Sequence, residues 1–148
     1  MNCGNKIDSK LSIFGEAPIH KAVLSKVRES EKTLALHAII DSKANLDNMD
    51  SNGWTALHHA CHNGDLESAT ILIRDGGANV NSYSNQQRTP LHFAALNNHK
   101  HCISLLLGKG AQLEWTDEQK CTPLHLACKK GNIESVALLL TSGANIYA

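Results

Sequence analysis

The chain has 148 residues, the length of a single domain, with 42% hydrophobic residues and 14 acidic side chains balanced by 14 basic ones. The zero net charge disfavours a nucleic-acid-binding protein, which normally has a basic face, and the apolar content excludes a disordered chain. No apolar run is long enough to cross a membrane, and the five cysteines lack C-x-x-C spacing, so we expect an intracellular protein, cytoplasmic or nuclear.

The N-terminal part of the chain predicts a helix pair of unusual form. It carries neither the apolar run of a signal peptide nor the glycine after Met1 that myristoylation requires. A first helix is expected at Ala17-Pro18-Ile19-His20, because proline suits the first helical position. A charged connector over residues 25–32 then lengthens the turn, and Lys43 stands where a helix-ending glycine is expected.

Three closer copies of this unit follow along the chain. They are marked by the segments Thr55-Ala56-Leu57-His58, Thr89-Pro90-Leu91-His92 and Thr122-Pro123-Leu124-His125, at spacings of 34 and 33 residues. A threonine at the start of each can cap a helix by accepting a hydrogen bond from an unpaired backbone N–H. Short first helices are therefore predicted over residues 57–61, 91–95 and 124–128.

The rest of each copy predicts a turn, a second helix and a loop. Gly64, Asn98 and Gly131 mark the turns. Apolar second helices include residues 71–73, 105–107 and 138–140, and a glycine after each suits a left-handed helix end. Polar, extended stretches such as residues 79–85 then predict projecting hairpin-like loops.

The pattern strongly resembles the ankyrin repeat family, whose T-P-L-H-x-A signature and 33-residue period are matched almost in full over 89–94 and 122–127. The resemblance implies an all-α solenoid of stacked helix–turn–helix units with β-hairpin-like loops, in a single domain over residues 1–148. The repeats are expected at 12–49 (divergent, capping), 50–83, 84–116 and 117–148. The last helix, 133–140, looks internal, so we expect further repeats or another domain after Ala148 in the parent protein.

Nine histidines raise the question of a metal site. Four of them, His20, His58, His92 and His125, belong to the signature, and the resemblance implies that each bonds to the neighbouring turn. His58 and His62 have the spacing of a zinc pair, but no glutamate follows His58 and no further ligand is evident. We therefore expect no metal and no cofactor.

The cysteines predict packing rather than chemistry. Cys61 and Cys128 occupy a helix position that is alanine in the repeat between them, so both are interpreted as small buried side chains. Cys121 precedes a cap threonine and is interpreted as a partly exposed, ordinary thiol.

The resemblance also implies where a protein or peptide partner binds, on a concave face made of loop tips and the exposed sides of the first helices. Of these positions, Trp54, Tyr83, Arg88 and Trp115 are residue types enriched in binding hot spots, although Trp54 could instead pack against the neighbouring hairpin. The full predicted set is Met49, Ser51, Asn52, Trp54, His62, Asn63, Tyr83, Asn85, Gln86, Arg88, Leu96, Asn97, Trp115, Thr116, Glu118, Gln119, Cys121, Lys129 and Lys130.

Asn81 is a separate candidate, for modification. It matches a loop position that is hydroxylated in some members of the family, while the alternative is that its side chain stabilises the loop by bonding to backbone.

The leading functional hypothesis is a non-catalytic, monomeric interaction module of a larger scaffold, adaptor or regulatory protein, without nucleic-acid binding or direct membrane insertion. The alternatives are a free-standing inhibitor that covers an enzyme or factor, and a metal- or thiol-dependent enzyme, for which no convergent acid, base and nucleophile are evident. A methyl-lysine reader with a cage of Trp54, Tyr83 and Trp115 is a further alternative.

Overall fold

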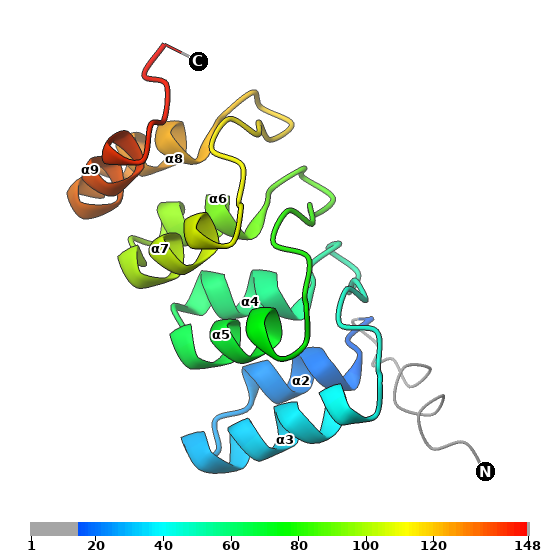
Figure 1. The fold of residues 1–148 in the computed structure, drawn as a ribbon. Helices are drawn as coiled ribbons and strands as arrows, with labels where there is room; N and C mark the ends of the chain where they lie inside the picture. Colours follow the sequence, from blue (N-terminus) through cyan, green and yellow to red (C-terminus); the bar gives the residue numbers. More distant parts are fainter. Residues whose placement is uncertain (1–14, 148) are drawn as a thin grey trace.

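The computed structural model describes residues 15–147, in which eight helices form four consecutive pairs. The pairs are α2 (Pro18–Leu24) with α3 (Glu29–Asp41), α4 (Ala56–Asn63) with α5 (Leu66–Arg74), α6 (Pro90–Leu96) with α7 (Lys100–Gly108), and α8 (Pro123–Lys130) with α9 (Ile133–Thr141). Figure 1 shows the pairs stacked in chain order, with the connecting loops projecting from one side. Residues 12–14 of the first expected repeat and Ala148 lie outside the described residues.

The stack has two rows of helices. The first helices of the pairs, α2, α4, α6 and α8, contact one another in sequence, and the second helices, α3, α5, α7 and α9, do the same behind them. Leucine and isoleucine side chains fill the space between the rows, among them the fully buried Leu57, Leu72, Leu91, Ile103 and Leu106. The structure is thus the all-α solenoid that the sequence predicted, and its described part contains helices but no strands.

The helices α4, α6 and α8 include the predicted ranges and extend one residue before them and one or two after them. The Thr55 and Thr122 hydroxyls accept the backbone N–H of His58 and His125, three residues further on. Gly64 ends α4 in the left-handed region, with φ of 72°, and a Cβ there would lie 2.5 Å from Nδ1 of His99. Asn98 adopts the same backbone conformation after α6, with φ of 59°, as its alignment with the turn glycines predicted.

One burial prediction is wrong, for Cys128. Cys61 is buried beneath the following helix pair, but Cys128 is exposed on α8. The two positions are equivalent within their repeats, but in the described part of the chain no helix pair follows α8 and α9. Leu140, which is 40% exposed where the equivalent Ile73 is 8% exposed, differs for the same reason.

Candidate functional site

Three loops form the projecting edge of the stack, and each is closed at its base by a polar side chain at the same position. Asp50 Oδ1 accepts the backbone N–H of Asn52 at 2.9 Å and of Trp54 at 3.0 Å. Asp117 Oδ1 does the same in the third loop, with the N–H groups of Gln119 and Cys121 at 3.0 and 2.9 Å. In the middle loop, Ser84 Oγ accepts the Arg88 N–H at 3.3 Å.

The two carboxylates are held in their ionised form. Burial works to raise the pKa of Asp50 and of Asp117, but hydrogen bonds donated to each carboxylate outweigh it, so both pKa values are lowered. The carboxylate of Asp117 also accepts a hydrogen bond from Nε of Arg88 at 3.1 Å. The carboxylate of Asp50 lies 2.8 Å from Nε2 of His59.

Backbone hydrogen bonds also join neighbouring loop tips. The Asn85 N–H donates to the Asn52 carbonyl and the Glu118 N–H to the Gln86 carbonyl, both at 3.1 Å. The Asn85 carboxamide adds a bond to the Ser51 carbonyl, also at 3.1 Å. The tips therefore form one continuous edge rather than three independent loops.

Signature histidines attach each loop to the helix before it. Nδ1 of His58 accepts the Thr55 N–H at 2.9 Å, so Nε2 carries the proton and donates to the Arg88 carbonyl, also at 2.9 Å. His92 makes the same pair of bonds, from the Thr89 N–H and to the Cys121 carbonyl, at 3.1 and 3.0 Å. Burial lowers the pKa of each of these two rings from 6.5 to about 4. These two histidines are therefore neutral and structural, which explains their place in the pattern.

A cluster of rings around Trp54 is the main feature of the inner face, by which we mean the side of the first helices that faces the loops. The Trp54 centroid lies 4.4 Å from that of Phe93, 4.9 Å from that of His59 and 5.2 Å from that of His62. Trp54 is half-buried, and with Asn52, Asn85 and Gln86 it lines a hollow of about 350 Å³. Trp54 thus packs mainly on the inner helices, while the neighbouring loop forms a wall of the hollow. We call this hollow and its ring cluster the Trp54 groove.

Two members of this cluster, His59 and Phe93, were missed by the sequence-based prediction. Both occupy the variable position of the T-P-L-H-x-A signature, directly after the structural histidine. The signature histidine points into the stack, so the residue directly after it on the helix faces the loops. Its place next to the histidine is the sequence signal that could have identified His59 and Phe93. Asn97, which was predicted, donates its carboxamide to Nδ1 and to the carbonyl of His62, at 2.9 and 3.0 Å.

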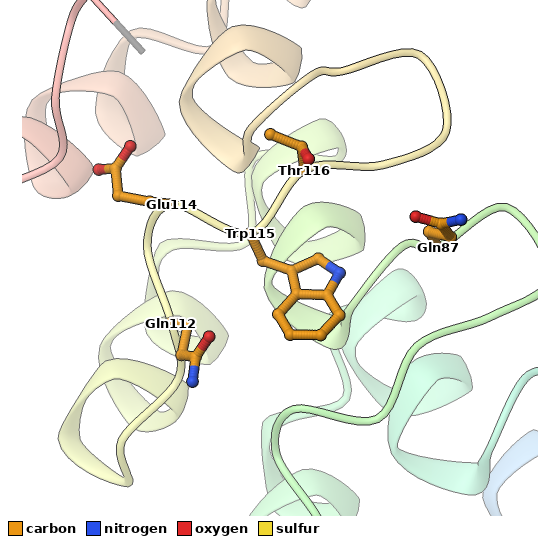
Figure 2. Close-up of a pocket in the computed structure, with 5 residues that line it drawn as sticks. All are labelled: Gln87, Gln112, Glu114, Trp115 and Thr116. Carbon is orange, nitrogen blue, oxygen red and sulfur yellow. The ribbon is translucent and has the colours of Figure 1, made fainter.

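The remaining predicted aromatic residues lie elsewhere. Tyr83 and Trp115 stack on each other with centroids 5.6 Å apart and an angle of 24° between the rings. Trp115 and Thr116 line a hollow of about 390 Å³ with Gln87, Gln112 and Glu114, as Figure 2 shows, and this hollow shares no residue with that at Trp54. The predicted set therefore divides between two surfaces, and the three aromatic rings of the suggested methyl-lysine cage do not meet as one cluster.

The guanidinium of Arg88 forms an ion pair within the protein. Asp117, its partner, has a side chain only 1% exposed, and that of Arg88 is 20% exposed. The pair joins two loops and gives Arg88 a structural role, while its contact with a partner stays a prediction.

Other predicted residues stand at the edges of the inner face. Asn63 ends α4, Leu96 is half-buried at the end of α6, and Cys121 is half-buried with its carbonyl bonded to His92. The exposed positions are Met49, Ser51, Asn52, Asn63, Asn85, Gln86, Glu118, Gln119, Lys129 and Lys130.

Asn81 bridges two loops instead of acting within one. Its carboxamide donates to the Gly110 carbonyl at 3.2 Å and accepts the Gln112 N–H at 3.0 Å. Side-chain-to-backbone bonding is thus present, but it reaches the next repeat. Whether Asn81 is hydroxylated stays a prediction.

Over residues 15–147, no group of three or more histidine, cysteine, aspartate or glutamate side chains is arranged to hold a metal ion. None of the helices in that range combines the length and the apolar character needed to cross a membrane.

Comparison with known proteins gives consistent matches. Two family models, both described as ankyrin repeats, match residues 20–73 and 76–148. Among curated proteins, the chain is 31% identical over 99 residues to mouse Rabankyrin-5, covering 67% of this chain and 8% of that protein. It is 33% identical over 97 residues to human BCL-6 corepressor-like protein 1, covering 66% and 5%, and 32% identical over 90 residues to bovine ankyrin repeat and SOCS box protein 2, covering 61% and 14%. The chain therefore spans a small part of the length of these relatives.

Proposed function

This chain belongs to the ankyrin repeat family, and on that basis we propose that it is a non-catalytic module that binds a protein or peptide in the Trp54 groove. Ankyrin repeats are generally protein–protein interaction modules, and the relatives described above contain theirs within longer proteins. That arrangement favours a monomeric part of a scaffold, adaptor or regulatory protein over a free-standing inhibitor. We expect it to act inside the cell, in cytoplasm or nucleus, on proteins rather than nucleic acids.

The observation that carries this proposal is the half-buried indole of Trp54, held 4.4 Å from Phe93 beside an open hollow. A large aromatic side chain already fixed by its neighbours loses little conformational freedom when a partner covers it, which is why such residues dominate binding energies. The exposed carboxamides of Asn52, Asn85 and Gln86 around it offer both donors and acceptors for a peptide backbone.

Affinity capture with three forms of the protein tests the proposal. The wild type is compared with Trp54→Ala and with a control variant, Leu34→Ala. Leu34 is 70% exposed on α3, in the row of second helices. A protein that is captured by the wild type and by Leu34→Ala but lost with Trp54→Ala supports the groove. The same set of captured proteins with all three forms would count against it.

A second variant guards against a folding defect. Because Trp54 packs on Phe93, Trp54→Ala is checked by circular dichroism and thermal unfolding. Gln86→Glu changes only an exposed carboxamide at the rim of the hollow and should leave folding unchanged. Unaltered capture by Gln86→Glu together with unaltered capture by folded Trp54→Ala would exclude this groove as the binding site.

A further inference from the structure

A second groove runs along the flank of the loops and shares a single lining residue, Asn85, with the Trp54 groove. Three adjoining hollows, of about 540, 230 and 390 Å³, all contain Gln87 in their walls. The first includes Asp47, Met49 and Tyr83, the second Tyr83 and Trp115, and the third Trp115 and Glu114. We call these together the flank groove, and it extends over loops from three successive repeats.

The floor of the flank groove is aromatic without a structural need. Tyr83 is 51% exposed and stacks on Trp115 at 5.6 Å. Counted from the cap threonines, Trp115 is equivalent to Ser82 and Tyr83 to Thr116, so small polar residues meet the demands of the fold at the same positions. Large apolar surface that is exposed beyond what folding needs is typical of a binding site.

The polar groups beside these rings include several hydrogen-bond donors. Gln87 and Gln112 have exposed carboxamides, each with two N–H donors, and the indole of Trp115 adds another. In Figure 2 the indole nitrogen lies on the side of the ring nearer Gln87. A ligand that offers acceptors beside flat apolar groups fits this combination.

Charge is confined to the two ends of the groove, and it is negative. Asp47 is the charged residue of the first hollow and Glu114 that of the third, and no lysine or arginine lines any of the three. Backbone N–H groups hold both carboxylates in place, that of Asn79 on Asp47 at 3.1 Å and that of Asn145 on Glu114 at 2.8 Å.

We propose that the flank groove binds a proline-rich segment in the polyproline II conformation, with a basic residue at each end. Such a segment has no internal hydrogen bonds, so its carbonyls are free to accept from Gln87, Gln112 and Trp115. Its proline rings pack on the Tyr83–Trp115 stack, as proline-rich ligands pack in other aromatic-lined grooves. Its basic ends pair with Asp47 and Glu114. The contacts proposed for this ligand use none of the residues that line the hollow at Trp54.

The geometry favours this ligand over a methylated lysine. A cage needs aromatic walls that face a cation from several sides, whereas Tyr83 and Trp115 lie at 24° to each other in a stack. A neutral sugar would also lie on the stack, but it would bring no positive charge to the carboxylates at the two ends of the groove.

The test uses the whole chain and a synthetic polyproline peptide with two arginines at each end, titrated by isothermal calorimetry. We compare the wild type with Trp115→Ser and Tyr83→Thr, which introduce the residues found at the equivalent positions of neighbouring repeats. Each variant should weaken binding about tenfold or more, as expected for aromatic hot spots. Trp54→Ala should bind the peptide with wild-type affinity. Gln87→Met, which removes the donors without adding a charge, should weaken binding as well and serves if the aromatic variants fold poorly.

Two control peptides test the ligand class. Glycine and serine in place of the prolines, or glutamates in place of the arginines, should each weaken binding about tenfold or more. Equal affinity of the glycine–serine peptide, wild-type affinity in Trp115→Ser, or binding of a neutral oligosaccharide but not of the peptide would each overturn the proposal. The proposal would also be overturned if Trp54→Ala folds and is the one variant that loses peptide binding. A negative result for the capture experiment with the Trp54 groove leaves this titration unaffected.

Discussion

Nε of Arg88 donates a hydrogen bond to Oδ2 of Asp117 at 3.1 Å, and this ion pair joins the bases of two neighbouring loops. The same carboxylate accepts two backbone N–H groups of its own loop through its other oxygen. Arg88 therefore contributes to the shape of the loop edge, on which both proposed grooves depend.

Replacing Arg88 with alanine should destabilise the protein. The change leaves the nearly inaccessible Asp117 carboxylate without its cationic partner, and we expect a loss of about 2 kcal/mol in the free energy of unfolding. Urea denaturation measures it, with Glu118→Ala at an exposed loop tip as the control. A change below about 0.5 kcal/mol, the range of ordinary surface substitutions, would contradict a structural role for Arg88.

Stability should fall steeply in mild acid. The pKa of His58 and of His92 is lowered from 6.5 to about 4 in the folded protein, because burial disfavours the charged ring. Between these values the unfolded chain binds protons that the folded chain does not, so stability is full above pH 6.5 and is lost as the pH falls towards 4. Each ring should contribute about 1.4 kcal/mol per pH unit in that window.

Chemical denaturation at a series of pH values between neutrality and pH 4 tests this expectation. His92→Gln should lower stability at neutral pH but make the remaining slope shallower, because one of the two strongly shifted rings is gone. His101→Gln, at an exposed position on α7, should keep the wild-type slope. A wild-type free energy of unfolding that stays flat down to pH 4 would mean that these rings are protonated in the fold without cost.

The four cysteines that the structure describes should divide into two classes by their reactivity. Cys128 is exposed and Cys121 half-buried, whereas Cys61 and Cys102 are buried. The contact with Cys102 and the burial of Cys61 raise the pKa of the Cys61 thiol, so little reactive thiolate forms there. A maleimide should label Cys121 and Cys128 in the native protein within minutes, and Cys61 and Cys102 only on unfolding, as peptide mass spectrometry would show. Rapid native labelling of Cys61 would mean that the stack opens between α4 and the following pair.

The divergent first helix pair should depend on one ion pair. Lys32 Nζ on α3 lies 2.9 Å from Oδ2 of Asp65, and their side chains are only 12% and 15% exposed. The same aspartate caps α5 by accepting the Ser68 N–H at 3.0 Å. Lys32→Met, which keeps the apolar stem, should cost about 1 kcal/mol, and Asp65→Ala should cost more, because it also removes the cap.

Thermal unfolding of the two variants gives the order of the effects. Lys26→Met, at an exposed position of the connector before α3, is the matched control. Equal destabilisation by Lys32→Met and Asp65→Ala would show that the cap contributes nothing beyond the ion pair.

The local features of the fold could be predicted from the sequence because each depends on a few neighbouring residues. Thr55, Gly64 and Asn98 act through their own backbone and nearby N–H groups, so their roles follow from the pattern. The exposure of Cys128 could not be predicted in this way, because burial at that position depends on the presence of a following helix pair.

The candidate site was less predictable for two reasons. The pairing of Arg88 with Asp117 spans 29 residues, and no local pattern specifies it. The division between the two grooves, in contrast, was present in the sequence. Trp54 stands directly before its cap threonine, while Trp115 stands seven residues before Thr122, so the two tryptophans occupy different positions of the repeat. Counting from the cap would have separated them.

The hydrogen bonds of the signature histidines indicate where the repeats can be joined or divided in protein engineering. The ring of His58 serves its own helix through the Thr55 N–H and the next loop through the Arg88 carbonyl, so a segment that ends at residue 83 deprives a buried donor of its acceptor. The smallest self-sufficient unit is therefore a helix pair together with the whole loop after it, offset from the sequence repeat. Fusions and repeat exchanges should join between Cys121 and Thr122, which keeps His92 with its carbonyl. A junction between Arg88 and Thr89 keeps the bond of His58 but divides the one from Nε2 of His99 to the His62 carbonyl.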